Sequence, residues 1–162
     1  MTPKTLSVDP ARCNGCKDCE LACANRHNGM SKPTGSRIRI IQGDVVEGFY
    51  LPMTCQHCEN PPCLAACPNN AISRDKELNR VMIDDALCIG CQMCVSACPF
   101  GAMAFDSDRG LAFKCDLCDG DPDCVRACEP KALEYVEGHK LHYPRIRSSA
   151  ERHYQVIRHM VS

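Results

Sequence analysis

The residues of this chain that could carry chemistry are its sixteen cysteines, which form four groups of four with none left over. These quartets are Cys13/Cys16/Cys19/Cys23, Cys55/Cys58/Cys63/Cys67, Cys88/Cys91/Cys94/Cys98 and Cys115/Cys118/Cys124/Cys128. The first and third have the spacing C-x2-C-x2-C-x3-C, by which thiolates surround a cubane iron–sulfur cluster. The second and fourth lengthen one gap, to C-x2-C-x4-C-x3-C and C-x2-C-x5-C-x3-C. The spacing predicts four [4Fe–4S] clusters, with all sixteen cysteines as iron ligands.

Disulfide bonds and zinc sites are the other common uses of so many cysteines. A disulfide scaffold is typical of secreted chains, but residues 1–10 contain Lys4 and no apolar run, so nothing there resembles a signal peptide. Zinc ribbons use two C-x2-C pairs separated by a long linker, whereas here a third cysteine follows after two to five residues and a fourth after three more. The spacing therefore favours clusters over both alternatives.

The quartets also indicate what the clusters would do. A cluster held by three cysteines leaves one iron open to substrate, but no C-x3-C-x2-C triad occurs here. The sequence also contains no Walker motif and no dinucleotide-binding fingerprint. With every iron capped by protein, we expect a non-catalytic chain that carries electrons.

The composition indicates a small apolar core. The 162 residues include no Trp, four Phe and four Tyr, so cluster ligation is expected to supply much of the folding free energy. The formal charge of −1 treats the thiols as neutral, and four oxidised clusters with their thiolates bring it to about −9. This charge argues against nucleic-acid binding. No segment approaches the ~20 apolar residues of a membrane span, and the reducing cytoplasm, the expected location, keeps thiolates available.

The segments between the cysteines predict short helices and strands. Each quartet is expected to begin a short helix near its third cysteine and to present the fourth from it. Residues 24–54 are predicted to hold a hairpin, with one strand at 37–40 and a return within 45–51. Five short apolar runs are expected to pair as strands that cover the clusters: residues 71–72, 81–83, 103–105, 111–113 and 133–135.

Three residues inside the quartets are expected to act on the clusters without binding iron. Gly15 and Gly90 lie in the first gaps of their quartets, where glycine lets the backbone approach a cluster closely. His57 lies between Cys55 and Cys58 and could be a ligand. Because four cysteines are already available for each cluster, a hydrogen bond that tunes the cluster is its favoured role.

The last segment, residues 139–162, is basic. Its His residues have no cysteine or carboxylate cluster beside them, so they do not indicate a metal site. Residues 148–151 have capping-box spacing, and Ala150, Tyr154, Ile157 and Val161 share one helical face. The pattern predicts a basic amphipathic helical tail, which either packs on its own domain or grips a partner subunit.

Three segments carry a resemblance to a known family: CQHCENPPC at 55–63, CIGC at 88–91 with ACPFGA at 97–102, and KCDLC at 114–118 with CVRAC at 124–128. Over residues 8–136 the chain resembles the four-cluster electron-transfer subunits of molybdenum and tungsten oxidoreductases, hydrogenases and carbon monoxide dehydrogenases. Subunits of membrane-bound dimethyl sulfoxide and nitrate reductases are also similar, but generally have a longer gap in the fourth quartet and larger insertions. The five-residue gap at 119–123 looks more like the small polyferredoxin subunit of tungsten aldehyde oxidoreductases, or the ferredoxin subunits of formate dehydrogenase and hydrogenase complexes.

The resemblance implies an α+β fold of two fused bacterial-ferredoxin-like modules, each with two clusters. The outer module would combine quartets 13–23 and 115–128 and the inner module quartets 55–67 and 88–98, with the hairpin insertion at 24–54. This domain would span residues 1–138, followed by the tail at 139–162. In the family, the fourth cysteine of one motif binds the cluster of its partner motif. The implied ligand sets are Cys13/Cys16/Cys19/Cys128, Cys115/Cys118/Cys124/Cys23, Cys55/Cys58/Cys63/Cys98 and Cys88/Cys91/Cys94/Cys67.

The resemblance also implies a line of clusters from the first quartet through the fourth and second to the third, with each end near the surface. Such a chain would relay electrons between a catalytic subunit, such as a tungsten or molybdenum aldehyde oxidoreductase, and a second redox module carrying flavin and NAD or a ferredoxin. The alternatives are a subunit of a formate dehydrogenase, hydrogenase or carbon monoxide dehydrogenase complex, or a free polyferredoxin. Copies stacked end to end could lengthen the relay. We expect no nucleic-acid partner and no membrane insertion.

Overall fold

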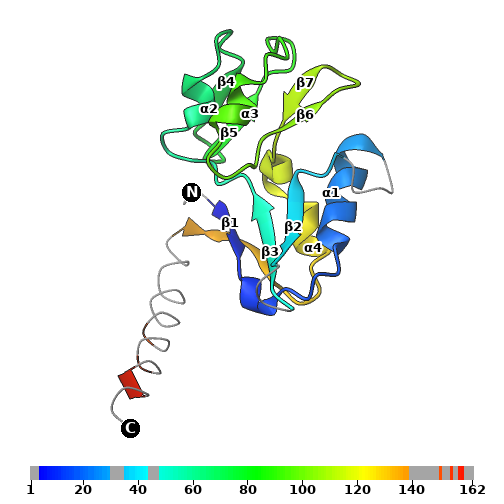
Figure 1. The fold of residues 1–162 in the computed structure, drawn as a ribbon, viewed down its shortest axis with the longest axis vertical. Helices are drawn as coiled ribbons and strands as arrows, with labels where there is room; N and C mark the ends of the chain where they lie inside the picture. The colour runs from blue at the N-terminus through cyan, green and yellow to red at the C-terminus, as the bar shows by residue number, and fades with distance from the viewer. Residues whose placement is uncertain are drawn as a thin grey trace.

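The computed structural model describes residues 4–29, 35–43 and 48–138, together with the single tail residues Ala150, Tyr154, Ile157 and Arg158. Short helices and antiparallel strand pairs make up these parts (Figure 1), which agrees with the expected α+β class. In chain order the elements are β1 (Lys4–Val8), the 3-10 turn η1 (Pro10–Arg12), α1 (Asp18–Asn28), β2 (Ile38–Gln42), β3 (Tyr50–Thr54), α2 (Pro62–Ala65), β4 (Ile72–Asp75), β5 (Arg80–Ile83), α3 (Met93–Ala97), β6 (Ala104–Asp106), β7 (Leu111–Phe113), η2 (Leu117–Gly120), α4 (Asp123–Arg126) and β8 (Leu133–Glu137).

The first and last strands of the described domain pair with each other. β1 and β8 are antiparallel, with Lys4 opposite Glu137 and Val8 opposite Leu133. The helices that follow β1 and precede β8, α1 and α4, also pack together. The chain therefore closes on itself, and its two ends form one half of the domain, shown in blue and yellow to orange in Figure 1. β8 includes the strand expected at residues 133–135, whereas no strand was expected at β1.

α1 extends further than the sequence analysis expected. Acidic residues in its first turn and Arg26 and His27 in its last turn complement the helix dipole. The helix ends at Gly29, whose left-handed φ of 62° allows its N–H to donate to the Asn25 carbonyl at 3.0 Å. The predicted hairpin segment, 24–54, therefore began too early, because residues 24–28 continue the helix.

The hairpin itself consists of β2 and β3, which are antiparallel with Ile38 opposite Thr54. Ile38 and Ile40 are buried, as the alternating pattern predicted. The Ile40 N–H donates to the buried Glu20 carboxylate at 2.5 Å, which ties the hairpin to α1. Of the expected return strand, Tyr50 and Leu51 belong to β3 and Phe49 directly precedes it, whereas Val45 and Val46 lie outside the described part of the chain.

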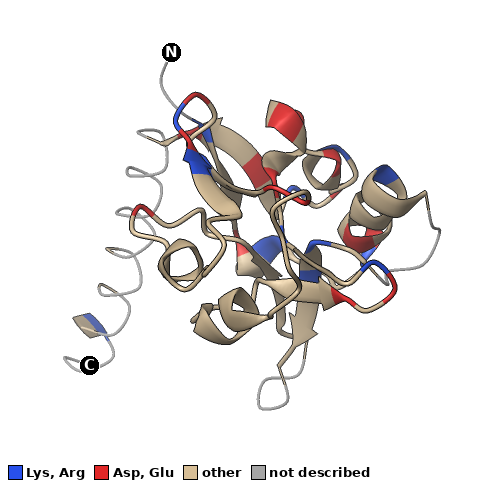
Figure 2. Cartoon of the chain, turned by 90° about the horizontal axis from the view of Figure 1, so that it is seen from above, with Lys and Arg blue, Asp and Glu red and all other residues tan. Residues whose placement is uncertain are grey.

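The middle of the chain forms the other half of the domain, shown in green in Figure 1. α2 packs on α3, β4 pairs with β5, and β6 pairs with β7. These hairpins confirm the pairing of the runs at 81–83 and 111–113 with the apolar runs before them. Figure 2 shows basic and acidic residues interspersed over the described elements in that view.

Each half has its own small core, and both cores combine cysteines with apolar side chains. The outer core consists of the buried residues Cys19, Cys23, Ile38, Ile40, Cys124 and Leu133. The inner core consists of the buried residues Cys63, Ile72, Val81, Cys94, Met103 and Ala112. The apolar side chains thus surround the cysteines, which places sulfur at the centre of each half.

Four residues of the tail are described, and all four are helical and exposed. Tyr154 is 65% exposed and Ile157 is 59% exposed. Val161 and the capping-box residues 148 and 149 lie outside the described residues, as does Glu151. No helix among the described residues is both long and apolar enough to cross a membrane.

Candidate iron–sulfur sites

Two cavities in the inner half are each lined by four cysteines. One is lined by Cys55, Cys58, Cys63 and Cys98, with apolar residues around them. The other is lined by Cys67, Cys88, Cys91 and Cys94, again among apolar residues. Each cavity therefore takes three cysteines from one quartet and the fourth from the other quartet.

The outer half brings the first and fourth quartets together. Cys19, Cys23 and Cys124 lie in the outer core, and Cys13 and Cys128 pack against it. This arrangement follows from the packing of α1 on α4.

The thiols of the outer half affect one another's ionisation. Burial, Glu20 and the nearby Cys128 raise the pKa of Cys19 to about 12. Burial, Asp116 and Cys23 likewise raise the pKa of Cys118 to about 11. Cys128 thus lies near a cysteine of the first quartet, and Cys23 near one of the fourth.

The helices deliver the third cysteine of each quartet, as expected, but only α1 also carries its fourth. Cys63, Cys94 and Cys124 lie within α2, α3 and α4, whose fourth cysteines follow the helix end. Three of these helices have only four or five residues, so a fourth cysteine four positions after the third falls outside the helix. α1, with 11 residues, is long enough to include Cys23.

Backbone N–H groups are directed at cysteine sulfurs in both halves. Arg37 donates to Cys23 Sγ at 3.2 Å, Ala71 to Cys67 Sγ at 3.3 Å and His57 to Cys55 Sγ at 3.4 Å. Hydrogen bonds to ligand sulfur are one means by which proteins set cluster potentials.

Gly15 and Gly90 both have left-handed φ, at 76° and 70°. A Cβ at Gly15 would lie 2.5 Å from the ring of Tyr50, and one at Gly90 would meet the carbonyl oxygen of Gly110. Glycine is therefore required in these two loops for conformation and for space.

His57 is held in one neutral form. Burial and the charge of Lys114 lower its pKa to about 3. Its Nδ1 accepts the Val81 N–H at 3.0 Å, so the ring proton lies on Nε2. That Nε2 is buried and has no protein partner among the described residues.

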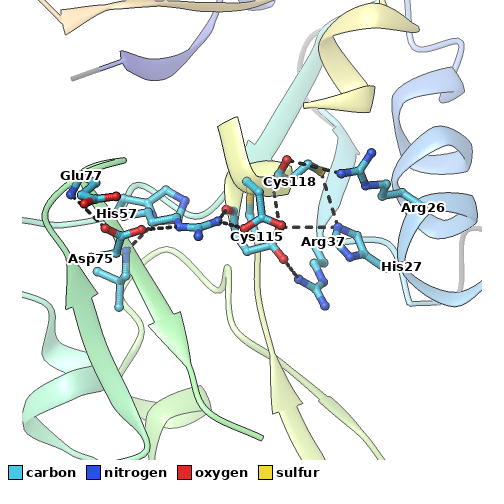
Figure 3. A network of polar contacts seen from close by, with 12 residues as sticks. Arg26, His27, Arg37, His57, Asp75, Glu77, Cys115 and Cys118 are labelled. Atoms are coloured by element: carbon cyan, nitrogen blue, oxygen red, sulfur yellow. Dashed lines mark hydrogen bonds and ion pairs between the residues drawn. The ribbon is translucent and has the colours of Figure 1, made fainter. Parts of the chain in front are cut away.

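A polar network, shown in Figure 3, connects α1 with the loop that carries Cys115 and Cys118. Asp116 accepts from Arg37 at 2.6 Å and lies 3.6 Å from His27 Nε2, which is 3.7 Å from Cys118 Sγ. Burial opposes the ionisation of Asp116, but Arg37 and the Cys118 N–H outweigh it and lower the pKa. No local sequence signal predicts this network, because its members are separated by about 80 to 90 positions.

The donors present fit iron–sulfur clusters. In the inner half four cysteines line each of two cavities, and burial raises the pKa of several thiols of the chain, so that metal binding must displace their protons. The buried His57 Nε2 lacks a partner among the described residues. Since buried polar groups are nearly always hydrogen-bonded, an acceptor sulfur of a cluster would complete this site.

Comparison with known proteins agrees with this chemistry. Residues 46–138 match the family described as a 4Fe-4S dicluster domain. The chain belongs to this family. The family resemblance expected from the cysteine motifs is thereby confirmed, and the chain is a ferredoxin-like iron–sulfur protein of the electron-transfer type.

Individual relatives cover most of the chain. An aliphatic sulfonate oxidoreductase polyferredoxin-like subunit from Pyrococcus furiosus is 38% identical over 136 residues, which cover 82% of this chain and 78% of the relative. A putative electron transport protein, YsaA of Escherichia coli, is 38% identical over 88% of this chain and 95% of its own length. Among solved structures, a chain of the BamBC active-site complex of benzoyl coenzyme A reductase matches with a TM-score of 0.49 and 26% identity, over 84% of this chain and 78% of that one.

Proposed function

We propose that the chain holds four [4Fe–4S] clusters in two fused ferredoxin-like modules, in which the paired quartets exchange their fourth cysteines. The ligand sets are Cys13/Cys16/Cys19/Cys128 for cluster 1, Cys115/Cys118/Cys124/Cys23 for cluster 2, Cys55/Cys58/Cys63/Cys98 for cluster 3 and Cys88/Cys91/Cys94/Cys67 for cluster 4. The observation that carries this proposal is the pair of inner cavities, because their cysteines are the proposed sets for clusters 3 and 4. The outer core supports the outer sets, because it brings Cys19, Cys23 and Cys124 together with Cys128 packed against them.

The four clusters would form a line. Cys19 and Cys124 share the outer core, so clusters 1 and 2 are neighbours. Lys114 lines the cavity of Cys55 and donates to the Cys115 carbonyl oxygen at 2.7 Å, which supports clusters 2 and 3 as neighbours. Cys63 and Cys94 share the inner core, which does the same for clusters 3 and 4.

Both ends of this line reach the surface. Of the sixteen cysteines, the exposed ones are Cys16 and Cys91. Cys16 belongs to cluster 1 and Cys91 to cluster 4, so an electron could enter at one end and leave at the other. We infer that the chain is a non-catalytic wire within a cytoplasmic oxidoreductase complex, between a catalytic subunit and a second redox module.

A tungsten or molybdenum oxidoreductase of the aldehyde-oxidising type is the catalytic partner that we propose, and a flavin–NAD or ferredoxin module is the second. The compact fourth quartet supports this assignment, since its five-residue gap at 119–123 runs directly from the end of η2 to the first residue of α4. A free polyferredoxin would hold the same clusters but would have no permanent partner.

The test is anaerobic purification of the untagged protein from its own cells, followed by metal and sulfide analysis and mass spectrometry of co-eluting chains. We expect about sixteen iron and sixteen sulfide per chain, together with a larger subunit that carries tungsten or molybdenum. Zinc without acid-labile sulfide would overturn the cluster assignment. A full set of clusters in a chain that elutes alone would identify a free polyferredoxin instead.

A further inference from the structure

Lys114 is a buried cation at the junction of the two halves. Its residue exposure is 4%, and the only other buried basic residue among those described is Arg80, at 8%. Burying a charge without a partner is strongly unfavourable. Each of these two side chains therefore needs a source of negative charge.

Arg80 has such partners within the protein. It lies 3.0 Å from an Asp75 carboxylate oxygen and 2.7 Å from one of Asp119. It also donates to the carbonyl oxygen of Asp116 at 2.7 Å. Its charge is balanced by these two carboxylates.

Lys114 has no carboxylate partner among the described residues. Its Nζ donates to two neutral acceptors, the carbonyl oxygens of Val81 and, at 2.7 Å, of Cys115. An ammonium group has three N–H donors, so neither its charge nor its third donor is satisfied by the described protein groups. A negatively charged group bound beside Nζ would supply both the charge and the acceptor.

The position of Lys114 indicates what that is. The side chain lines the cavity formed by Cys55, Cys58, Cys63 and Cys98, and Lys114 directly precedes Cys115 in the chain. Its Nζ donates to the Cys115 carbonyl oxygen at 2.7 Å. One ammonium group therefore lies beside cysteines of two different proposed sets.

We propose that Lys114 is the shared counter-ion of clusters 2 and 3 and raises the reduction potentials of both relative to a neutral side chain. This inference rests on the proposed ligand sets. Reduction adds one negative charge to a cluster, and a fixed positive charge nearby stabilises the more negative state. Electron transfer between the halves passes between these two clusters, so the charge of Lys114 stabilises the reduced form of both clusters at that step.

The experiment is an EPR-monitored redox titration of the holo-protein and of Lys114 variants. Lys114→Met removes the charge at similar length, and Lys114→Gln removes it while keeping hydrogen-bond donors. Lys114→Arg keeps the charge. Lys76→Met is the matched control, since it deletes the same charge from an exposed position in the β4–β5 turn.

In the two neutral variants, two of the four midpoint potentials should fall by at least about 59 mV each. For a one-electron couple this shift corresponds to a tenfold change in the ratio of oxidised to reduced cluster. The shifted signals should be those that Cys98→Ala and Cys23→Ala abolish. In Lys114→Arg, both of these potentials should stay close to their values in the unmodified protein. In Lys76→Met, all four potentials should be unchanged.

Unchanged potentials in both neutral variants would overturn the inference, as would equal shifts in all four clusters. If both neutral variants lose clusters 2 and 3 while Lys114→Arg keeps all four, the charge is needed to hold them, which supports the counter-ion role. Loss of the same clusters in Lys114→Arg as well would show that only the shape of the side chain matters. Fewer than four clusters in the unmodified protein would refute the proposed function rather than the role of Lys114.

Discussion

Iron counting in paired cysteine variants can decide how the quartets share their clusters. In the structure, Cys98 ends α3 in the third quartet but lines the cavity of Cys55, Cys58 and Cys63. Cys98 and Cys55 should therefore bind one cluster, whereas Cys98 and Cys88 should bind two different ones. Two alanine substitutions in one ligand set damage one cluster, and the same number spread over two sets damages two.

The iron content follows directly from this geometry. Cys55→Ala with Cys98→Ala removes two ligands from a single cubane, which should be lost and leave about twelve iron atoms per chain. Cys88→Ala with Cys98→Ala removes one ligand from each of two cubanes. That variant should retain about eight iron atoms, or about fourteen with a three-iron EPR signal if each damaged cluster keeps three irons.

The assay is iron and sulfide analysis with EPR after anaerobic reconstitution. Ser96→Ala serves as the control, because Ser96 is exposed on α3 two residues before Cys98 and is not a proposed ligand. It should retain about sixteen irons. The reasoning is refuted if the two double variants exchange their iron contents, since each quartet would then bind its own cubane.

Three further predictions concern the fold and the tail. Leu133 lies in the outer core at 2% exposure, so Leu133→Ala should lower the free energy of unfolding of the holo-protein by ~2–5 kcal/mol, measured by urea unfolding. The control Arg12→Ala breaks an exposed ion pair with Glu134 and should cost under about 1 kcal/mol. Similar losses in both variants would contradict the assigned core. Gly15→Ala should lower the stability of the holo-protein by at least ~1–2 kcal/mol, because φ is 76° and the Tyr50 ring is close. The loss should appear as a lower midpoint temperature for the disappearance of cluster absorbance, and an unchanged midpoint would disprove the crowding. Because Ile157 of the tail is exposed, truncation after Gly138 should abolish complex assembly, measured by gel filtration, and leave the iron content unchanged. Loss of iron would show that the tail belongs to the domain's own fold.

The sequence by itself determined the cofactor chemistry and the local elements. A cluster-binding loop needs its cysteines a few positions apart, so the spacing within a quartet is visible in a short stretch of chain. The same is true of Ile38 and Ile40, whose alternation with arginine predicted a strand, and of the β4–β5 and β6–β7 hairpins, which join neighbouring segments. Where local signals were weak, the prediction was less accurate, as at the end of α1.

Only the tertiary structure decided which distant groups meet. Cys128 reaches Cys19 because α1 packs on α4, and β1 finds its partner in β8 more than a hundred residues later. Arg37 and Asp116 form their ion pair across 79 positions. In the sequence, nothing distinguishes Lys114 from the other basic residues. Its burial without a carboxylate partner among the described residues follows only from the tertiary structure. The physical reason is that charge balance and burial depend on all neighbours in space, and the sequence orders neighbours only along the chain.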